Sequence, residues 1–218
     1  MELTPLFINA ENKKILIIGT GEVGIRRAYR FLETKSNVNI ITKDIDKEIK
    51  QDLINKGAIF HNKTQLEPLI KTSHIIIAAT NNHQLNQEIA KKTNKNQQLL
   101  NLPDNPTQGN TIIPSTFKID DITISLYTNS KSPLMAKTLR KKIQKIITPQ
   151  DIQNIKLQEH IRKKLKNEIP LQKERKKIME IIQQNNEIQQ LLKENKISEA
   201  QKQAQKIISK KKEMKQTE

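Results

Sequence analysis

The chain contains no cysteine and no tryptophan among its 218 residues, and only 3% of its residues are aromatic. The absence of cysteine excludes disulfide bonds and metal sites built on thiolates. No apolar run approaches the roughly 20 residues that span a bilayer, and no basic segment precedes an apolar one at the N-terminus. We therefore expect a soluble, cytoplasmic protein with an aliphatic core and no membrane partner.

Positive charge is concentrated in the second half of the chain. Residues 1–115 carry 15 Lys and Arg against 11 Asp and Glu, whereas residues 116–218 carry 24 against 12. A basic half can bind nucleic acid, an anionic membrane or an acidic small molecule, or can be a solvated surface in a lysine-rich composition. Aromatic residues end at Tyr127, which argues against single-stranded nucleic acid bound by base stacking.

Only five glycines occur, and three of them lie in the hexapeptide Gly19-Thr20-Gly21-Glu22-Val23-Gly24. The apolar run before it is typical of a strand buried on both faces, and residues 25–32 have a helical pattern. This setting predicts a dinucleotide-binding loop, in which glycines permit the turn, the approach of a pyrophosphate and close packing of the helix. The first N–H groups of the helix would face the anion. The alternative is a tight turn that binds nothing.

Strands and helices then alternate along the chain. We predict strands at 38–42, 57–60, 74–80 and 98–102 and helices at 45–53, 66–70 and 81–94, a pattern that demands a parallel sheet with right-handed crossovers. Asp44 lies 20 residues after Gly24, the distance at which an acidic residue binds the adenosine ribose in this fold. It could instead cap the helix at 45–53. The fourth strand ends in small residues at the edge where a cofactor would pass.

The pattern changes near residue 110. Residues 111–118 and 121–127 predict a β-hairpin, which is marginal in water alone and which we expect to pair with its copy in a second subunit. Ser132-Pro133 predicts a helix start, and amphipathic helices follow from 151. The expected fold class is α/β: a Rossmann-type NAD-binding domain at 1–113, a dimerisation segment at 114–148 and a basic helical domain at 149–218.

Six short sequences within residues 3–147 have a distinctive order and spacing. They are Pro5-Leu6-Phe7, Gly19–Val23 followed by Arg26-Arg27, Ala78-Ala79-Thr80-Asn81, Asn101-Leu102-Pro103-Asp104, Ile113-Pro114-Ser115 and Lys131-Ser132-Pro133-Leu134-Met135-Ala136. Together they resemble the precorrin-2 dehydrogenase family, the NAD-dependent module of siroheme synthase. The resemblance implies a homodimer that oxidises precorrin-2, a tetrapyrrole polycarboxylate, to sirohydrochlorin in siroheme biosynthesis. Some members of the family also insert ferrous iron.

The resemblance also implies roles for single residues. Asp104 matches the family's essential aspartate and is the candidate proton acceptor, although it could merely shape the turn between Pro103 and Pro106. Motif and resemblance together predict cofactor contacts at Gly19, Thr20, Gly21, Glu22, Val23, Gly24, Lys43, Asp44, Ala79 and Thr80. Candidates for substrate contact are Asn101, Lys131 and Ser132, and the basic residues Lys137, Arg140 and Lys141 lie close enough along the chain to be considered.

Two features leave alternatives open. The four histidines show no metal-ligand spacing, so we predict no metal site, although a dehydrogenase that is also a ferrochelatase is one rival interpretation. The other is a non-catalytic, NAD-responsive regulator whose basic helices bind DNA.

The family usually has a glycine pair before Lys-Ser-Pro, where this chain has Thr128-Asn129-Ser130. This sequence is less permissive at positive φ than a glycine pair, although asparagine tolerates that conformation.

Overall fold

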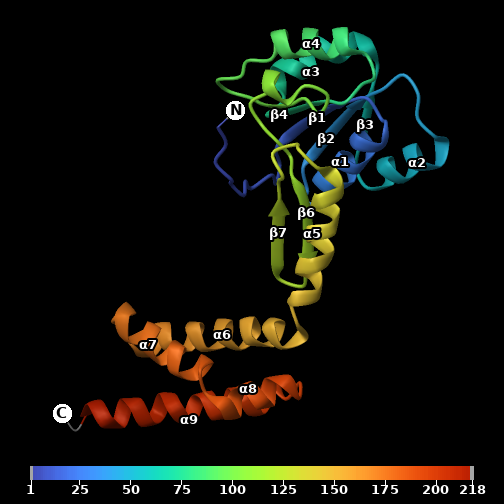
Figure 1. Cartoon of the computed structure of the whole chain (residues 1–218). Coiled ribbons are helices and arrows are strands. Elements are labelled where there is room, and N and C mark those ends of the chain that lie inside the picture. The colour runs from blue at the N-terminus through green and yellow to red at the C-terminus, as the bar shows by residue number, and fades with distance from the viewer. Residues whose placement is uncertain (1, 217–218) are drawn as a thin grey trace. The chain divides into compact units, whose positions relative to one another are not determined.

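Five parallel strands form the centre of the first of two structural units (Figure 1). The computed structural model describes residues 2–216, and the division between the units falls between Ile113 and Pro114. The strands lie in the order β3-β2-β1-β4-β5. Their bounds are β1 Lys14–Ile18, β2 Asn37–Ile41, β3 Ile59–His61, β4 Ile75–Ala78 and β5 Leu99–Asn101. The predicted parallel sheet is confirmed.

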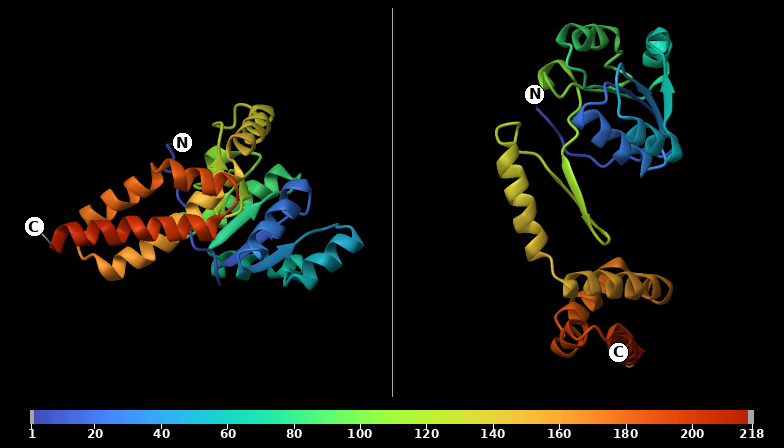
Figure 2. Two further views of the ribbon diagram at one scale, coloured as in Figure 1. Left: turned by 90° about the horizontal axis from the view of Figure 1, so that it is seen from below. Right: turned by 90° about the vertical axis from the view of Figure 1, so that its right-hand side faces the viewer.

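Helices cover both faces of this sheet (Figures 1 and 2). One face packs against α1 (Glu22–Leu32) and α2 (Lys47–Asn55), and the other against α3 (Leu66–Thr72) and α4 (His83–Lys92). Short 3₁₀ helices occur at η1 (Lys63–Gln65) and η2 (Pro106–Gln108). Along β1, Ile15 and Ile17 enter one core while Leu16 and Ile18 enter the other. This double burial is why the strand is apolar at every position.

Several predicted boundaries shift by a few residues, and one helix cap falls on another residue than the one considered. The third strand begins at Ile59 rather than at residue 57, because Gly57 adopts a φ of +100° at the turn out of α2. Asp46, not Asp44, caps α2: its Oδ1 accepts hydrogen bonds from the backbone N–H groups of Glu48 and Ile49 at 2.9 and 3.1 Å. Residues 111–113 precede the hairpin and belong to the first unit.

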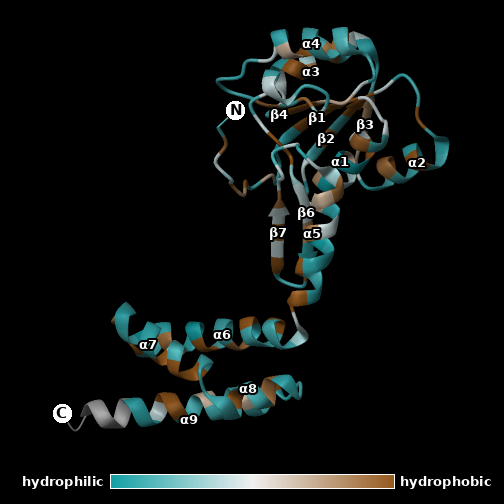
Figure 3. Cartoon of the chain, viewed as in Figure 1, coloured by the Kyte–Doolittle hydropathy of each residue, from teal (hydrophilic) through white to brown (hydrophobic). Residues whose placement is uncertain are grey.

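The second unit begins with the hairpin of β6 (Ser115–Ile119) and β7 (Ile122–Leu126), followed by α5 (Pro133–Ile146). Four further helices share one apolar core, and Figure 3 shows hydrophilic and hydrophobic residues alternating along them. They are α6 (Pro149–Glu168), α7 (Gln172–Gln183), α8 (Asn186–Lys193) and α9 (Ile197–Gln216). In the described part of the chain, no helix combines the length and apolar character needed to span a bilayer.

Candidate active site

The glycine-rich loop joins β1 to α1, and its three glycines have different reasons to be there. At Gly19, φ is +94° and a Cβ would lie 2.6 Å from the carbonyl oxygen of Ala79; at Gly24, a Cβ would lie 2.0 Å from that of Gly19. Packing alone therefore requires these two. At Gly21, φ is −66° and a Cβ would meet no atom of the described structure within 4 Å. The fold does not need this glycine, whereas a ligand in close contact would.

The N-terminus of α1 is open to an anion. Gly21 occupies the N-cap position and has no side chain to accept a hydrogen bond from the first turn. The carboxylate of Glu22 is exposed and pairs with Arg26, one turn further along the helix, at 3.3 Å. The N–H groups of Glu22 and Val23 therefore have no capping side chain, so an anion bound at this helix end can accept them, with the helix dipole in support.

Thr20 connects this loop to the segment that follows β2. Its Oγ1 lies 2.6 Å from Oγ1 of Thr42 and 2.7 Å from the carbonyl oxygen of Asp44, and Thr42 reaches the same carbonyl at 2.9 Å. Lys43 and Asp44 are thereby held beside the glycine loop with exposed side chains. The contacts of Thr42 were missed by sequence reasoning; a hydroxyl residue at the end of the predicted second strand was their only signal.

The end of β4 closes the same edge of the sheet. The N–H of Ala79 donates to the carbonyl oxygen of Ile18 at 2.8 Å, which places Ala79 against the glycine loop. The next residue, Thr80, donates from Oγ1 to Oδ1 of Asn86 at 2.7 Å, and Nδ2 of Asn86 donates back to the Thr80 carbonyl at 3.0 Å. The structure thus brings together the predicted cofactor residues from β1, β2 and β4.

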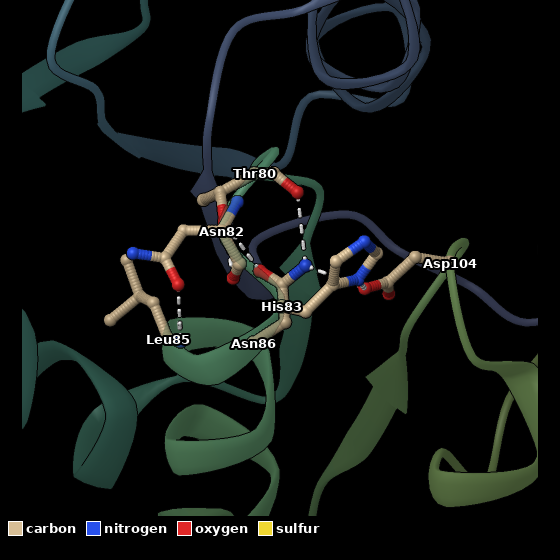
Figure 4. A network of polar contacts seen from close by, with 6 residues as sticks. All are labelled: Thr80, Asn82, His83, Leu85, Asn86 and Asp104. Carbon is tan, nitrogen blue, oxygen red and sulfur yellow. Dashed lines mark hydrogen bonds and ion pairs between the residues drawn. The ribbon is translucent and has the colours of Figure 1, made fainter.

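Asp104 lies between β5 and η2, where two side chains of α4 reach its carboxylate (Figure 4). Nδ2 of Asn86 donates to Oδ2 of Asp104 at 2.9 Å, and Nδ1 of His83 lies 2.9 Å from the same oxygen. The side chain of Asp104 is 21% exposed. Partial burial acts to raise its pKa, but the hydrogen bonds from Asn86 and His83 outweigh that effect, so the pKa lies below the usual aspartate value. The carboxylate is therefore ionised at neutral pH.

His83 and Asn86 are the site residues that sequence reasoning did not assign. They lie three positions apart at the start of α4 and so share one face of the helix. The side chain of Asn82 caps this helix by accepting the N–H of Leu85 at 3.0 Å, which fixes the first turn that carries His83. Asn86 is 1% exposed, and such a buried amide needs partners. Its partners, Thr80 and Asp104, tie the end of β4 to the residues after β5.

Two polar side chains, one partly and one fully buried, hold the segment before the hairpin. Nη2 of Arg27 donates to the carbonyl oxygen of Ile113 at 2.5 Å, and burial lowers the arginine pKa to about 10, with smaller contributions from Arg26 and Arg30. Nδ2 of Asn101 donates to the carbonyl oxygen of Thr111 at 3.0 Å, while its Oδ1 is buried without a partner among the described residues. Asn101 thus has a supporting contact within the first unit, and its contact with substrate stays a prediction.

The remaining candidates lie in the second unit and are held by local contacts. Ser132 caps α5, with Oγ accepting the N–H of Met135 at 3.2 Å, and Lys131 beside it is exposed. Arg140 stacks on the ring of Phe117 at 5.1 Å. Asn129 and Ser130 have φ values of 56° and 59°, so the loop does reach positive φ without glycine. Within residues 2–216, no group of three or more His, Asp or Glu side chains is placed to hold a metal ion.

Comparisons with known proteins identify the family of the chain. A family model described as "Putative NAD(P)-binding" matches residues 6–115. A protein of Methanosarcina barkeri named "Precorrin-2 dehydrogenase" is 32% identical over 181 residues, which cover 80% of each chain. A "Putative precorrin-2 dehydrogenase" of Methanocaldococcus jannaschii is 32% identical over 199 residues, covering 88% of this chain and 95% of that one.

This chain belongs to the precorrin-2 dehydrogenase family. The solved structure of "SirC, precorrin-2 dehydrogenase" superimposes with a TM-score of 0.75, covers 94% of this chain and 100% of its own, and is 18% identical. At that identity the likeness is evidence for the fold, and it extends through both units. The family assignment and the fold therefore rest on separate findings.

Proposed function

We propose that this chain is an NAD-dependent dehydrogenase that oxidises precorrin-2 to sirohydrochlorin, a step in siroheme biosynthesis. The observation that carries the proposal is the Asp104 carboxylate, which is ionised and held by Asn86, itself bonded to the end of β4 beside the glycine loop. Membership of the precorrin-2 dehydrogenase family supplies the substrate. The same Asn86 thus links the proposed base to the proposed cofactor edge.

The residues of the glycine loop fit a dinucleotide. The open space at Gly21 and the uncapped N–H groups of Glu22 and Val23 would receive the pyrophosphate. Asp44, held by Thr20, would accept hydrogen bonds from the adenosine ribose, with Lys43 beside it. Ala79 and Thr80 would border the cofactor where it crosses the sheet. When bound there, NAD supplies the hydride acceptor.

Asp104 would perform the proton transfer that the oxidation requires. Removal of two hydrogens from the tetrapyrrole delivers one as hydride and leaves one to depart as a proton. The Asp104 carboxylate can take this proton because it is unprotonated at neutral pH and only partly shielded from solvent. Asn86 fixes the carboxylate orientation through Oδ2. Such general-base catalysis is typically worth about 100- to 10,000-fold in rate.

The second unit is proposed to serve substrate binding and assembly. Its net charge suits a polycarboxylate, and Lys131 and Ser132 are its candidate substrate contacts. In the first unit, Asn101 is a separate candidate. We propose that residues 114–148 form the dimerisation segment and residues 149–218 a helical domain. In support, Leu134, Met135 and Ile146 of α5 are exposed, and the hairpin has only two strands. A homodimer would cover these surfaces.

An anaerobic assay with enzymatically generated precorrin-2 and NAD tests the proposal. Stoichiometric appearance of NADH and sirohydrochlorin without added metal supports it. We expect Asp104→Asn to bind NAD normally and to lose about 100-fold or more in kcat. Glu48→Gln, which removes an exposed carboxylate from α2 of the same unit, is the matched control and should leave kcat unchanged. Full turnover by Asp104→Asn would remove this residue from the mechanism.

A further inference from the structure

We infer that His83 is the residue through which the proton taken up by Asp104 leaves for solvent. The inference rests on the proposed function, because it assigns a second residue to the proton transfer that begins at Asp104. It is carried by the direct contact between Nδ1 of His83 and Oδ2 of Asp104 at 2.9 Å. Neither the composition of the chain nor the spacing of its histidines assigns His83 any role.

The exposed fraction increases from Asn86 through Asp104 to His83. Asn86 is 1% exposed, the Asp104 side chain 21%, and the His83 side chain 77%. Asn86 can only donate its amide hydrogens to the carboxylate and cannot accept the proton that Asp104 holds. His83 contacts the carboxylate with one ring nitrogen, and its ring is largely in solvent. It is therefore the titratable partner of Asp104 in this network with access to water (Figure 4).

The chemistry of imidazole suits this position. While Asp104 is ionised, Nδ1–H of His83 donates to its carboxylate. After Asp104 has taken the substrate proton, exchange with solvent moves the ring hydrogen from Nδ1 to Nε2, and Nδ1 then accepts the proton of the Asp104 carboxyl group across their contact. The imidazolium releases its Nε2 hydrogen to water, which restores the carboxylate and the Nδ1–H that donates to it. One proton leaves per substrate oxidised, which balances the hydride accepted by NAD.

The position of His83 also fits a fixed relay. It occupies the first residue of α4, and the cap made by Asn82 holds this turn in place. Asn86, one turn further along, holds the carboxylate from its buried side. The distance between imidazole and carboxylate is therefore set by the helix on one side and by the buried amide on the other. No further side chain has to move for the proton to pass from Asp104 to His83.

Chemical rescue of a His83→Ala variant tests this inference. In a dilute buffer with precorrin-2 and NAD, we expect kcat to fall about tenfold, less than the 100-fold or more expected when the base itself is removed. Imidazole added to the solution should restore most of the lost kcat, because a free imidazole can take the proton from Asp104 at this exposed position. Asp104→Asn should not be rescued, since it lacks the group that accepts the proton from substrate. His160→Ala, which removes an exposed histidine of α6, is the matched control for loss of an imidazole.

A readout that needs neither cofactor nor substrate accompanies the assay. In ¹⁵N spectra of the free protein, the ring nitrogen signals of His83 should change on Asp104→Asn and those of His160 should not. If His83→Ala has the same kcat as the wild type, the inference is wrong. A fall in kcat that imidazole does not restore also overturns the inference, because that would mean a positioning role alone. Absence of turnover by the wild type would instead refute the proposed function itself.

Discussion

The substitution Gly21→Ala separates a ligand-binding loop from a turn that binds nothing. At this position φ is −66° and ψ is 179°, a conformation that alanine adopts readily, and the added Cβ would meet no atom of residues 2–216 within 4 Å. The protein's own packing therefore gives no reason for glycine here. If a pyrophosphate lies on the first turn of α1, the new methyl group would occupy the space of its oxygens.

The expected changes in stability and in NAD affinity follow from the surroundings of Gly21 without and with a bound pyrophosphate. Alanine reduces the freedom of the unfolded chain, which stabilises by about 0.4–1 kcal/mol, while alanine is a poorer N-cap residue than glycine by a similar amount. The free energy of unfolding should thus change by less than about 1 kcal/mol. An intruding methyl group in a close-packed contact costs about 1–3 kcal/mol. That cost corresponds to a loss of NAD affinity of roughly 5- to 150-fold.

Thermal unfolding with and without NAD, together with calorimetric titration, measures both effects. At 100 times its Kd, NAD should stabilise the wild type by about 2.7 kcal/mol, and Gly21→Ala should lose about a third to nine tenths of this at the same concentration. Gly24→Ala is the matched comparison: its Cβ would lie 2.0 Å from the backbone oxygen of Gly19, so the apo protein itself should be destabilised. Wild-type NAD affinity in a folded Gly21→Ala variant would refute the assignment of the pyrophosphate to this helix.

Two further predictions concern the loop before α5 and the pH dependence of the reaction. Ser130→Gly should stabilise the protein by about 0.5 kcal/mol, because relief of the positive φ exceeds the added freedom of the unfolded chain. Asn129→Gly should stabilise it by less, since asparagine tolerates this conformation. Urea unfolding of both variants measures the two changes in stability. Because the pKa of Asp104 is lowered, kcat/KM should stay level as the pH falls to about 5 and should decline only below the usual aspartate range near 4. If the wild type instead shows an acidic limb centred near pH 6, and this limb persists in every Asp104 variant, the base is another residue.

The sequence predicts the parallel sheet well because local and tertiary preferences coincide there. The run from Ile15 to Ile18 is apolar at each position, and the structure buries each of these residues in one of two cores. The glycines at 19 and 24 are required by contacts within a few residues of β1 or at the end of β4. Such short-range requirements leave a direct trace in residue type. Boundaries shift where a single turn residue decides them, as Gly57 does before β3.

The polar part of the site was predicted less completely because its contacts join distant segments. His83 and Asp104 are 21 residues apart, and Thr20 and Thr42 are 22 apart. Neither pair has a periodic or motif signature, since each depends on how β2, β4 and β5 end at the same edge. Asp44 was considered as a possible cap of this helix, but Asp46 caps α2: an aspartate suits the position in either place, and only the backbone path decides.

The division of labour between the two units follows from where the polar contacts lie. The glycine loop, Asp44, Asn86 and Asp104 all belong to the first unit and are joined through Thr20 and Thr80. The proposed NAD-binding loop and the proposed proton acceptor thus lie in the same unit, each held by its own group of hydrogen bonds. In the second unit, by contrast, Ser132 caps α5 and Arg140 stacks on Phe117, which are structural contacts. We therefore expect the oxidation chemistry to depend on residues up to Ile113, and the basic second unit to contribute to holding a polycarboxylate and a second copy of the chain.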